Sequence, residues 1–140
     1  MNARFQVPKP YNEPTLDYSP KSPETKKLKD RIKTLKAEQP DIPLYIGGAE
    51  IRTGKLIDQR SPYDKRQMIG RYHEGTAKHT AQAIKAALKA RADWSRMAFS
   101  DRAAVFLKAA DLLAADFRWT LNGATMLCQS KNAYQAEIDA

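Results

Sequence analysis

The sequence predicts an extended N-terminal arm and a helix, then a short antiparallel β-meander, then a mostly α-helical second half. Three observations lead to this order. Prolines crowd residues 1–21, Gly and Ser-Pro breaks divide residues 43–75 into short β-type runs, and apolar residues recur at helical spacing from residue 76 onward. The composition, with 42% hydrophobic and 9% aromatic residues in a chain of 140, is that of a folded protein.

The arm and the first helix are separated by a helix-start signal. Residues 1–21 hold four prolines and little periodicity, so we expect an extended segment that docks elsewhere on the molecule. Ser22-Pro23-Glu24 then combines a hydroxyl N-cap, a proline at the first helical position and an acid in the first turn. A basic helix is therefore predicted over residues 22–39. A narrow apolar stripe is formed by Leu28, Ile32 and Leu35.

The β-meander is predicted over residues 43–75, as three or four short strands. Gly47-Gly48 permits the positive φ of a tight hairpin turn. Thr53-Gly54 and Ser61-Pro62 supply the other breaks. Strands and helices do not alternate in this segment, so by itself it does not predict a parallel α/β unit.

The helical part is predicted over residues 76–140. A first helix ends near Trp94, and Ser100-Asp101 is expected to cap a second with a wide apolar face. A third, from about Trp119 to Cys128, is expected to be weaker because Asn122 and Gly123 lower helix propensity. Asn132 is expected to cap a fourth, which begins AYQAEIDA.

Charge and composition restrict the classes of partner. The net charge is +8, and residues 1–60 and 61–140 each carry twelve basic and eight acidic residues. An excess spread this evenly argues against a nucleic-acid module, which concentrates its charge on one face or tail. The basic run Lys26–Lys36 is interpreted as a solvated helix face. No apolar run reaches the ~20 residues of a membrane span, and with a single cysteine and no secretory signal we expect a cytoplasmic location.

Residues able to carry chemistry are few and scattered. Cys128, the only cysteine, falls near the end of a predicted helix, where the dipole disfavours a thiolate, so we interpret it as a small buried hydrophobe. His73 and His79 share no helical face and are interpreted as surface or boundary residues. Glu137 and Asp139, two apart, point to different sides of a helix and form no acid/base pair. No phosphate-binding glycine motif occurs, and we predict no catalytic, cofactor-binding or metal-binding residue.

Several stretches in order resemble the N-terminal region of the aldehyde dehydrogenase superfamily. AIKAALKARADW (83–94) followed by DRAAVFLKAADLLA (101–114) is typical of the superfamily. The arm NEPTLDYSPKSPE (12–24) and the closing QAEIDA (135–140) narrow the resemblance to the 1-pyrroline-5-carboxylate dehydrogenases. IPLYIGGAEIRTG (42–54) and SPYDKRQMIGRYHEG (61–75) lie between them.

The resemblance implies an α/β parent fold, NAD as the cofactor, and oxidation of L-glutamate γ-semialdehyde to L-glutamate in proline catabolism. It also implies that the reactive cysteine and the cofactor contacts lie after residue 140, so that residues 76–140 form a truncated part of the cofactor-domain region. The chain alone is then expected to be inactive and to bind no NAD. The expected partner is the rest of a dehydrogenase, which is itself expected to be a homo-oligomer. Neither a nucleic acid nor a membrane is expected as a partner. A structural role is expected for Lys131.

Two alternatives of other classes stay open at this point. The first is a free-standing helical interaction module, which would fold as a well-behaved monomer. The second is a basic nucleic-acid-binding module that uses Lys26–Lys36, whose binding would weaken steeply with salt.

Overall fold

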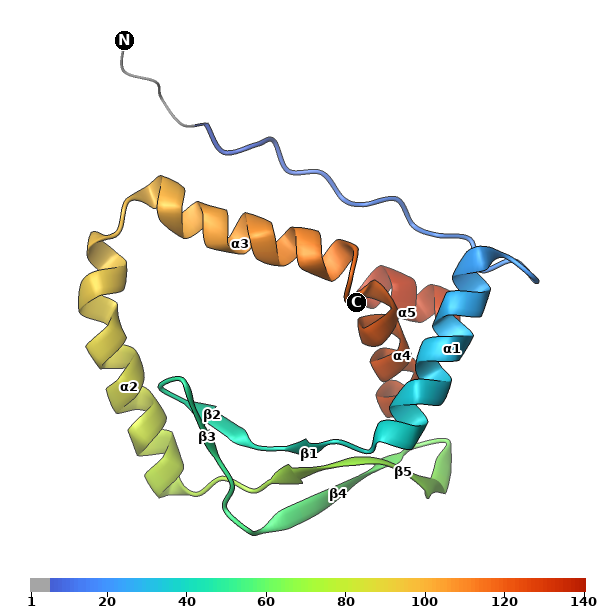
Figure 1. Ribbon diagram of the computed structural model, residues 1–140, viewed down its shortest axis with the longest axis horizontal. Coiled ribbons are helices and arrows are strands. Elements are labelled where there is room, and N and C mark those ends of the chain that lie inside the picture. Colours follow the sequence, from blue (N-terminus) through green and yellow to red (C-terminus); the bar gives the residue numbers. More distant parts are fainter. Residues whose placement is uncertain (1–5) are drawn as a thin grey trace.

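A computed structural model describes residues 6–140, and the first five residues of the predicted arm lie outside this range. The described part holds a proline-rich arm without regular structure, five helices and five short strands (Figure 1). In chain order these are α1 (Pro23–Glu38), β1 (Asp41–Ile42), β2 (Leu44–Ile46), β3 (Ala49–Ile51), β4 (Leu56–Ser61), β5 (Asp64–His73), α2 (Ala77–Arg96), α3 (Phe99–Ala114), α4 (Arg118–Gln129) and α5 (Ala133–Asp139). The predicted sequence of arm, helix, strands and helices is confirmed.

Three of the four buried apolar residues of the described part lie in the cluster of α1, α4 and α5. Helix α1 begins as its sequence predicts, with the Ser22 hydroxyl accepting a hydrogen bond from the Thr25 amide at 3.2 Å and Pro23 in the first turn. Leu28, Leu127 and Ala136, one from each helix, are buried. These apolar side chains form the main core of the described residues.

Helix α4 is regular, contrary to the expectation of a weakened segment. Asn122 and Gly123 are both buried within it. A Cβ atom on Gly123 would lie 2.9 Å from Leu35 Cδ1 and 3.4 Å from Ile32 Cγ1, so the glycine allows α1 to approach closely. Packing against the α1 stripe therefore compensates for the low helix propensity of this pair.

The strands form two small sheets rather than one meander. Strands β2 and β3 make an antiparallel hairpin whose turn is Gly47-Gly48, with φ of 60° and 84°. Strands β4 and β5 are antiparallel, and β1 pairs in parallel with β5, in the order β1-β5-β4. The sequence did not predict β1 or its parallel pairing, because a two-residue strand between Pro40 and Pro43 carries no alternating pattern.

Helix α2 stands away from the α1–α4–α5 cluster, and α3 reaches it only at its C-terminal end (Figure 1). Neither helix has a buried residue. Helix α3 starts at Phe99, with Ala98 as its N-cap and no side-chain cap, so the predicted cap at Ser100-Asp101 is wrong. Instead the Ser100 hydroxyl bonds to Asp101 within the first turn. Asn132 does cap α5, accepting from the Gln135 amide at 2.8 Å.

Candidate functional site

The most elaborate polar site surrounds the carboxylate of Glu137, on α5. Its side chain is 1% exposed and forms an ion pair with Arg118, which stands at the start of α4. Oε1 also accepts a hydrogen bond from the Leu16 amide at 2.9 Å, and Oε2 accepts one from the Tyr18 hydroxyl at 2.6 Å. The Asn122 amide donates to the same Oε2 at 2.6 Å. One carboxylate thus joins the arm, α4 and α5.

Two further hydrogen bonds and one contact between aromatic rings complete this cluster. The Arg118 guanidinium donates to the Pro14 carbonyl at 2.7 Å, and the Asn122 amide donates to the Tyr18 hydroxyl oxygen at 2.8 Å. The Tyr18 ring also meets the Trp119 ring edge-on, with centroids 6.5 Å apart. The arm predicted to dock elsewhere therefore docks here, through residues 14–18.

The cluster shifts the pKa values of its members in opposite directions. Burial by itself would raise the pKa of Glu137, but Arg118 and the three hydrogen-bond donors outweigh it and lower that pKa to about 2. Burial and the hydrogen bond to Glu137 raise the pKa of Tyr18 to about 12. Glu137 is therefore a carboxylate and Tyr18 a neutral phenol across the physiological range.

A cavity of about 210 Å³ lies beside this cluster. Its wall is formed by residues of the arm, α3, α4 and α5 (Glu13, Ala110, Leu113, Ala114, Arg118, Leu121, Asn122, Glu137 and Ala140). The Glu137 oxygens already accept from several donors, and no thiol or imidazole lines the cavity. The arrangement can hold a polar group, and Glu13 is the other carboxylate side chain in its wall besides Glu137.

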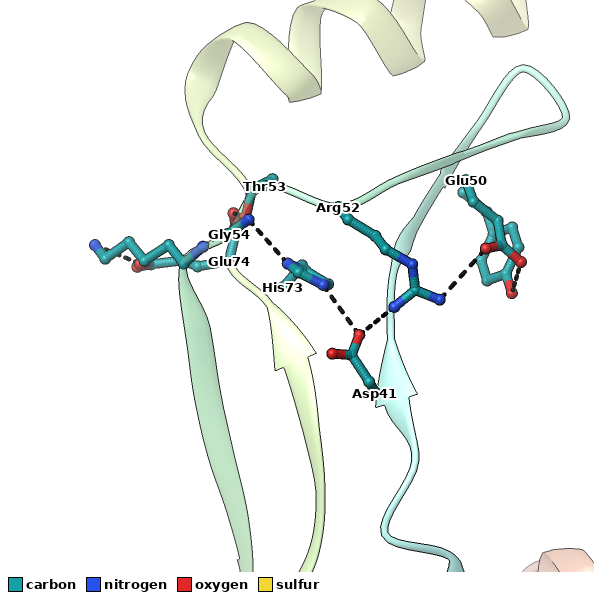
Figure 2. A network of polar contacts seen from close by, with 9 residues as sticks. Asp41, Glu50, Arg52, Thr53, Gly54, His73 and Glu74 are labelled. Atoms are coloured by element: carbon teal, nitrogen blue, oxygen red, sulfur yellow. Dashed lines mark hydrogen bonds and ion pairs between the residues drawn. The ribbon is translucent and has the colours of Figure 1, made fainter.

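A second polar network connects the strands (Figure 2). The His73 ring, at the end of β5, lies between the Gly54 amide and the Asp41 carboxylate, at 3.2 and 3.0 Å. Arg52 donates to the same carboxylate and also to Glu50. His73 is 5% exposed, so it is not a surface residue, but it does lie at the predicted strand–helix boundary, as the last residue of β5 before α2.

His79 behaves as a helix-start residue. Its Nδ1 atom accepts a hydrogen bond from the Thr76 amide at 3.1 Å, in the first turn of α2. The two histidines are thus engaged in separate local structures. Within residues 6–140 no group of three or more His, Cys, Asp or Glu side chains could hold a metal ion.

Cys128 is exposed, so its interpretation as a buried packing residue is wrong. It lies near the C-terminal end of α4, directly after the core residue Leu127. Partial burial of the thiol raises its pKa, which opposes the thiolate that a nucleophile requires. That Cys128 is not a catalytic residue stays a prediction, and its support is the raised pKa rather than packing.

The carboxylates at the end of the chain have different roles, as their two-residue spacing implies. Glu137 points into the cluster, whereas Asp139 is exposed and pairs with Lys131. That ion pair agrees with a structural role for Lys131. The Glu137 cluster was not predicted from the sequence, because its members lie 15 to 121 residues apart and no local pattern connects them.

None of the helices in the described range is long and apolar enough to cross a membrane. That agrees with the lack of a long apolar run in the sequence.

Comparisons with known proteins identify relatives along the whole chain. Residues 49–140 match the sequence profile described as the aldehyde dehydrogenase family. The probable delta-1-pyrroline-5-carboxylate dehydrogenase of Schizosaccharomyces pombe is 42% identical over 139 residues, which are 99% of this chain and 25% of that protein. The mitochondrial delta-1-pyrroline-5-carboxylate dehydrogenase of Dictyostelium discoideum is 38% identical over 99% of this chain and 25% of its own length.

A solved structure agrees with these sequence relatives. The delta-pyrroline-5-carboxylate dehydrogenase of Mycobacterium tuberculosis, bound with NAD, superposes with a TM-score of 0.94 at 45% identity. The match covers 100% of this chain and 26% of that one. The present chain thus spans about a quarter of the length of the relatives it matches. With the family profile matching most of its residues, the chain belongs to the aldehyde dehydrogenase family.

Proposed function

We propose that this chain is the N-terminal portion of an NAD-dependent dehydrogenase of proline catabolism. The proposed enzyme oxidises L-glutamate γ-semialdehyde, which forms from 1-pyrroline-5-carboxylate, to L-glutamate. The observation that carries the proposal is the likeness to the NAD-bound mycobacterial enzyme over every residue of this chain. We further propose that the complete enzyme is a cytoplasmic homo-oligomer that binds neither nucleic acid nor a membrane.

The described residues support a scaffold role rather than a catalytic one. Oxidation of an aldehyde by this route needs an activated thiol, donors for an oxyanion and a nicotinamide site. Cys128, with its raised pKa, does not supply the thiol. Dinucleotides are held by a glycine-rich turn from a strand into a helix, and the turn from β5 into α2 carries only Gly75. The residues present do not fit NAD, so we expect the chain alone to be inactive.

Unpaired apolar surface on α2 and α3 supports a missing partner within the same protein. A folded monomer of this mass exposes about 7,300 Å², whereas this chain, with its extended arm, exposes 10,845 Å². Leu88 on α2 is 60% exposed and Phe106 on α3 is 67% exposed. We propose that the remainder of the dehydrogenase covers these faces.

The same surface distinguishes the proposal from a free-standing helical interaction module. An isolated chain with uncovered apolar helices should self-associate and bind hydrophobic dyes. Sedimentation of the isolated chain, with dye fluorescence measured in parallel, checks this. A monomer that unfolds cooperatively and binds no dye would favour the interaction module.

The central test compares the chain with a version extended past residue 140. Sequencing of the coding region first establishes which residues come after codon 140, and the extended protein is then expressed. We expect it to reduce NAD⁺ with glutamate semialdehyde, whereas the 140-residue chain should not. Turnover by the short chain above a Cys128→Ala control would contradict the scaffold role. Fractionation of cells tests the cytoplasmic location, since the Dictyostelium relative is described as mitochondrial.

A further inference from the structure

The two ring nitrogens of His73 are held by groups of different kinds. Nδ1 faces the backbone amide of Gly54 at 3.2 Å, and Nε2 faces Asp41 Oδ1 at 3.0 Å (Figure 2). Gly54 lies in the turn between β3 and β4, and Asp41 lies in β1, so the ring connects two elements to the end of β5. Only 5% of the residue is exposed, and water does not readily replace either partner.

These partners determine the tautomer of the ring. A backbone N–H can only donate, so Nδ1 must be the unprotonated acceptor. The single ring proton then lies on Nε2, from which it is donated to the Asp41 carboxylate. The structure therefore contains the neutral Nε2–H form, with both nitrogens satisfied.

A second proton can only bind at Nδ1, where it would face the Gly54 N–H. Two donors cannot share a hydrogen bond, so a protonated ring must lose the contact with Gly54. The contact with Asp41 would survive and strengthen, because it becomes a charged pair. Protonation therefore changes one partner of the ring and keeps the other.

The charges around the ring act in both directions. The Asp41 carboxylate, on β1, favours a cationic ring. Arg52, just after β3, donates to the same Asp41 oxygen, and its positive charge disfavours a cationic ring. Glu50 on β3 offsets part of the Arg52 charge. On the other side of the turn, Lys55 and Glu74 pair with each other. These side chains are three acids and two bases, so the Asp41 carboxylate is available to pair with a charged ring.

Release of Gly54 would loosen the turn without opening the sheet. The turn keeps two other bonds to the end of β5: Thr53 Oγ1 donates to the Glu74 carbonyl at 3.1 Å, and the Glu74 amide donates to the Lys55 carbonyl at 2.8 Å. Gly54 itself is in the left-handed region with φ of 78°, so the turn conformation depends on local restraint. Residues 74–76 lead directly from this junction into α2.

We propose that His73 is a proton-operated latch that holds the 53–55 turn against the end of β5. The neutral ring closes the latch through Gly54, and protonation opens it while Asp41 retains the ring. The junction before α2 would then become more mobile as the pH falls. This device is independent of the dehydrogenase activity proposed above.

Amide hydrogen exchange at Gly54 tests the latch, in the complete protein that carries this chain. Protection factors, corrected for intrinsic exchange, are compared at about pH 8 and pH 5, the range over which imidazole normally changes charge. We expect protection of Gly54 to fall about tenfold at the lower pH, as the loss of one hydrogen bond predicts. Exchange within the β4–β5 pairing should stay unchanged.

Two variants assign the effect to one imidazole of this chain. His73→Asn places an amide oxygen near the Nδ1 position, so Gly54 should stay protected at both pH values. His79→Gln alters the other histidine of this chain and should retain the pH response of the parent. A Gly54 protection factor that is equal at both pH values in the parent overturns the proposal, whether or not His73→Asn folds. So does loss of the response in His79→Gln.

Discussion

The hydroxyl of Tyr18 donates a hydrogen bond to Glu137 Oε2 at 2.6 Å, across 119 residues of chain. This contact attaches the arm to the last helix. The Leu16 amide and the Arg118 guanidinium, which also reaches Pro14, hold the same two segments. The docking of the arm therefore uses a buried carboxylate in addition to the contact between the Tyr18 and Trp119 rings.

Glu137→Gln should destabilise the chain by about 2–4 kcal/mol, because it leaves the partly buried Arg118 without its counter-charge and places an amide among donors. Urea unfolding measures the change. Asp139→Asn is the matched control on the same helix, since its exposed pair with Lys131 contributes about 0–1 kcal/mol. Equal effects of the two substitutions would contradict the structural importance of the cluster.

Stability should fall in acid through the same residue. The pKa of Glu137 is lowered from 4.5 to about 2 in the folded chain, so its contribution is present above pH 4.5 and is lost as the pH falls through 2. A pKa shift of this size corresponds to about 3 kcal/mol of folding free energy. Unfolding measured from pH 5 to 2 should show a steeper loss in the parent than in Glu137→Gln. Parallel curves for the two proteins would refute the assignment.

Gly70→Ala should destabilise the sheet by about 1–3 kcal/mol. A Cβ atom at this position would lie 2.8 Å from the Pro40 carbonyl oxygen, a backbone atom that also accepts the Arg71 amide at 2.8 Å. Gly75→Ala is the control, because its Cβ would meet only the Leu44 side chain at ordinary contact distance. Thermal unfolding of both variants tests this, and a harmless Gly70→Ala would mean that β1 does not pack as closely on β5 as described.

Cys128→Ser should leave the kcat of the complete enzyme unchanged within about twofold, because an exposed thiol of raised pKa is neither a nucleophile nor a core residue. Steady-state kinetics with NAD⁺ and glutamate semialdehyde measure it. Reaction of the parent with a thiol reagent at Cys128 serves as a further check on exposure. A loss of kcat by several orders of magnitude would show that the reactive thiol had been misassigned.

The order of elements and their local starts were predictable from the sequence. Ser22-Pro23 and Asn132 are capping signals that act within a few residues, and both begin helices as expected. Gly47-Gly48 likewise forms the predicted turn. The cap at Ser100-Asp101 failed because α3 begins two residues earlier than its pattern suggested, with no side-chain cap. The family likeness, carried by stretches along the chain, is confirmed by the comparisons.

The candidate site was not predictable, for a physical reason. Glu137 gains its role from Tyr18, Asn122 and Arg118, and His73 gains its role from Asp41 and Gly54, all distant in the chain. A one-dimensional pattern records side-chain type and spacing, but it does not record which donors surround a carboxylate. Gly123 similarly reads as a helix weakness until the neighbouring stripe of α1 is placed against it.

By itself, then, the sequence determined the order of the elements, the starts of α1 and α5, the Gly47-Gly48 turn and the family of the chain, since those depend on local chemistry and on shared residues in order. Only the tertiary structure decided that Cys128 is exposed and that the side chains of His73 and Glu137 are buried. It also decided that α2 and α3 have no buried residue. Burial and electrostatic environment are properties of the neighbours that folding assembles. They result from packing between distant segments, which local spacing does not specify.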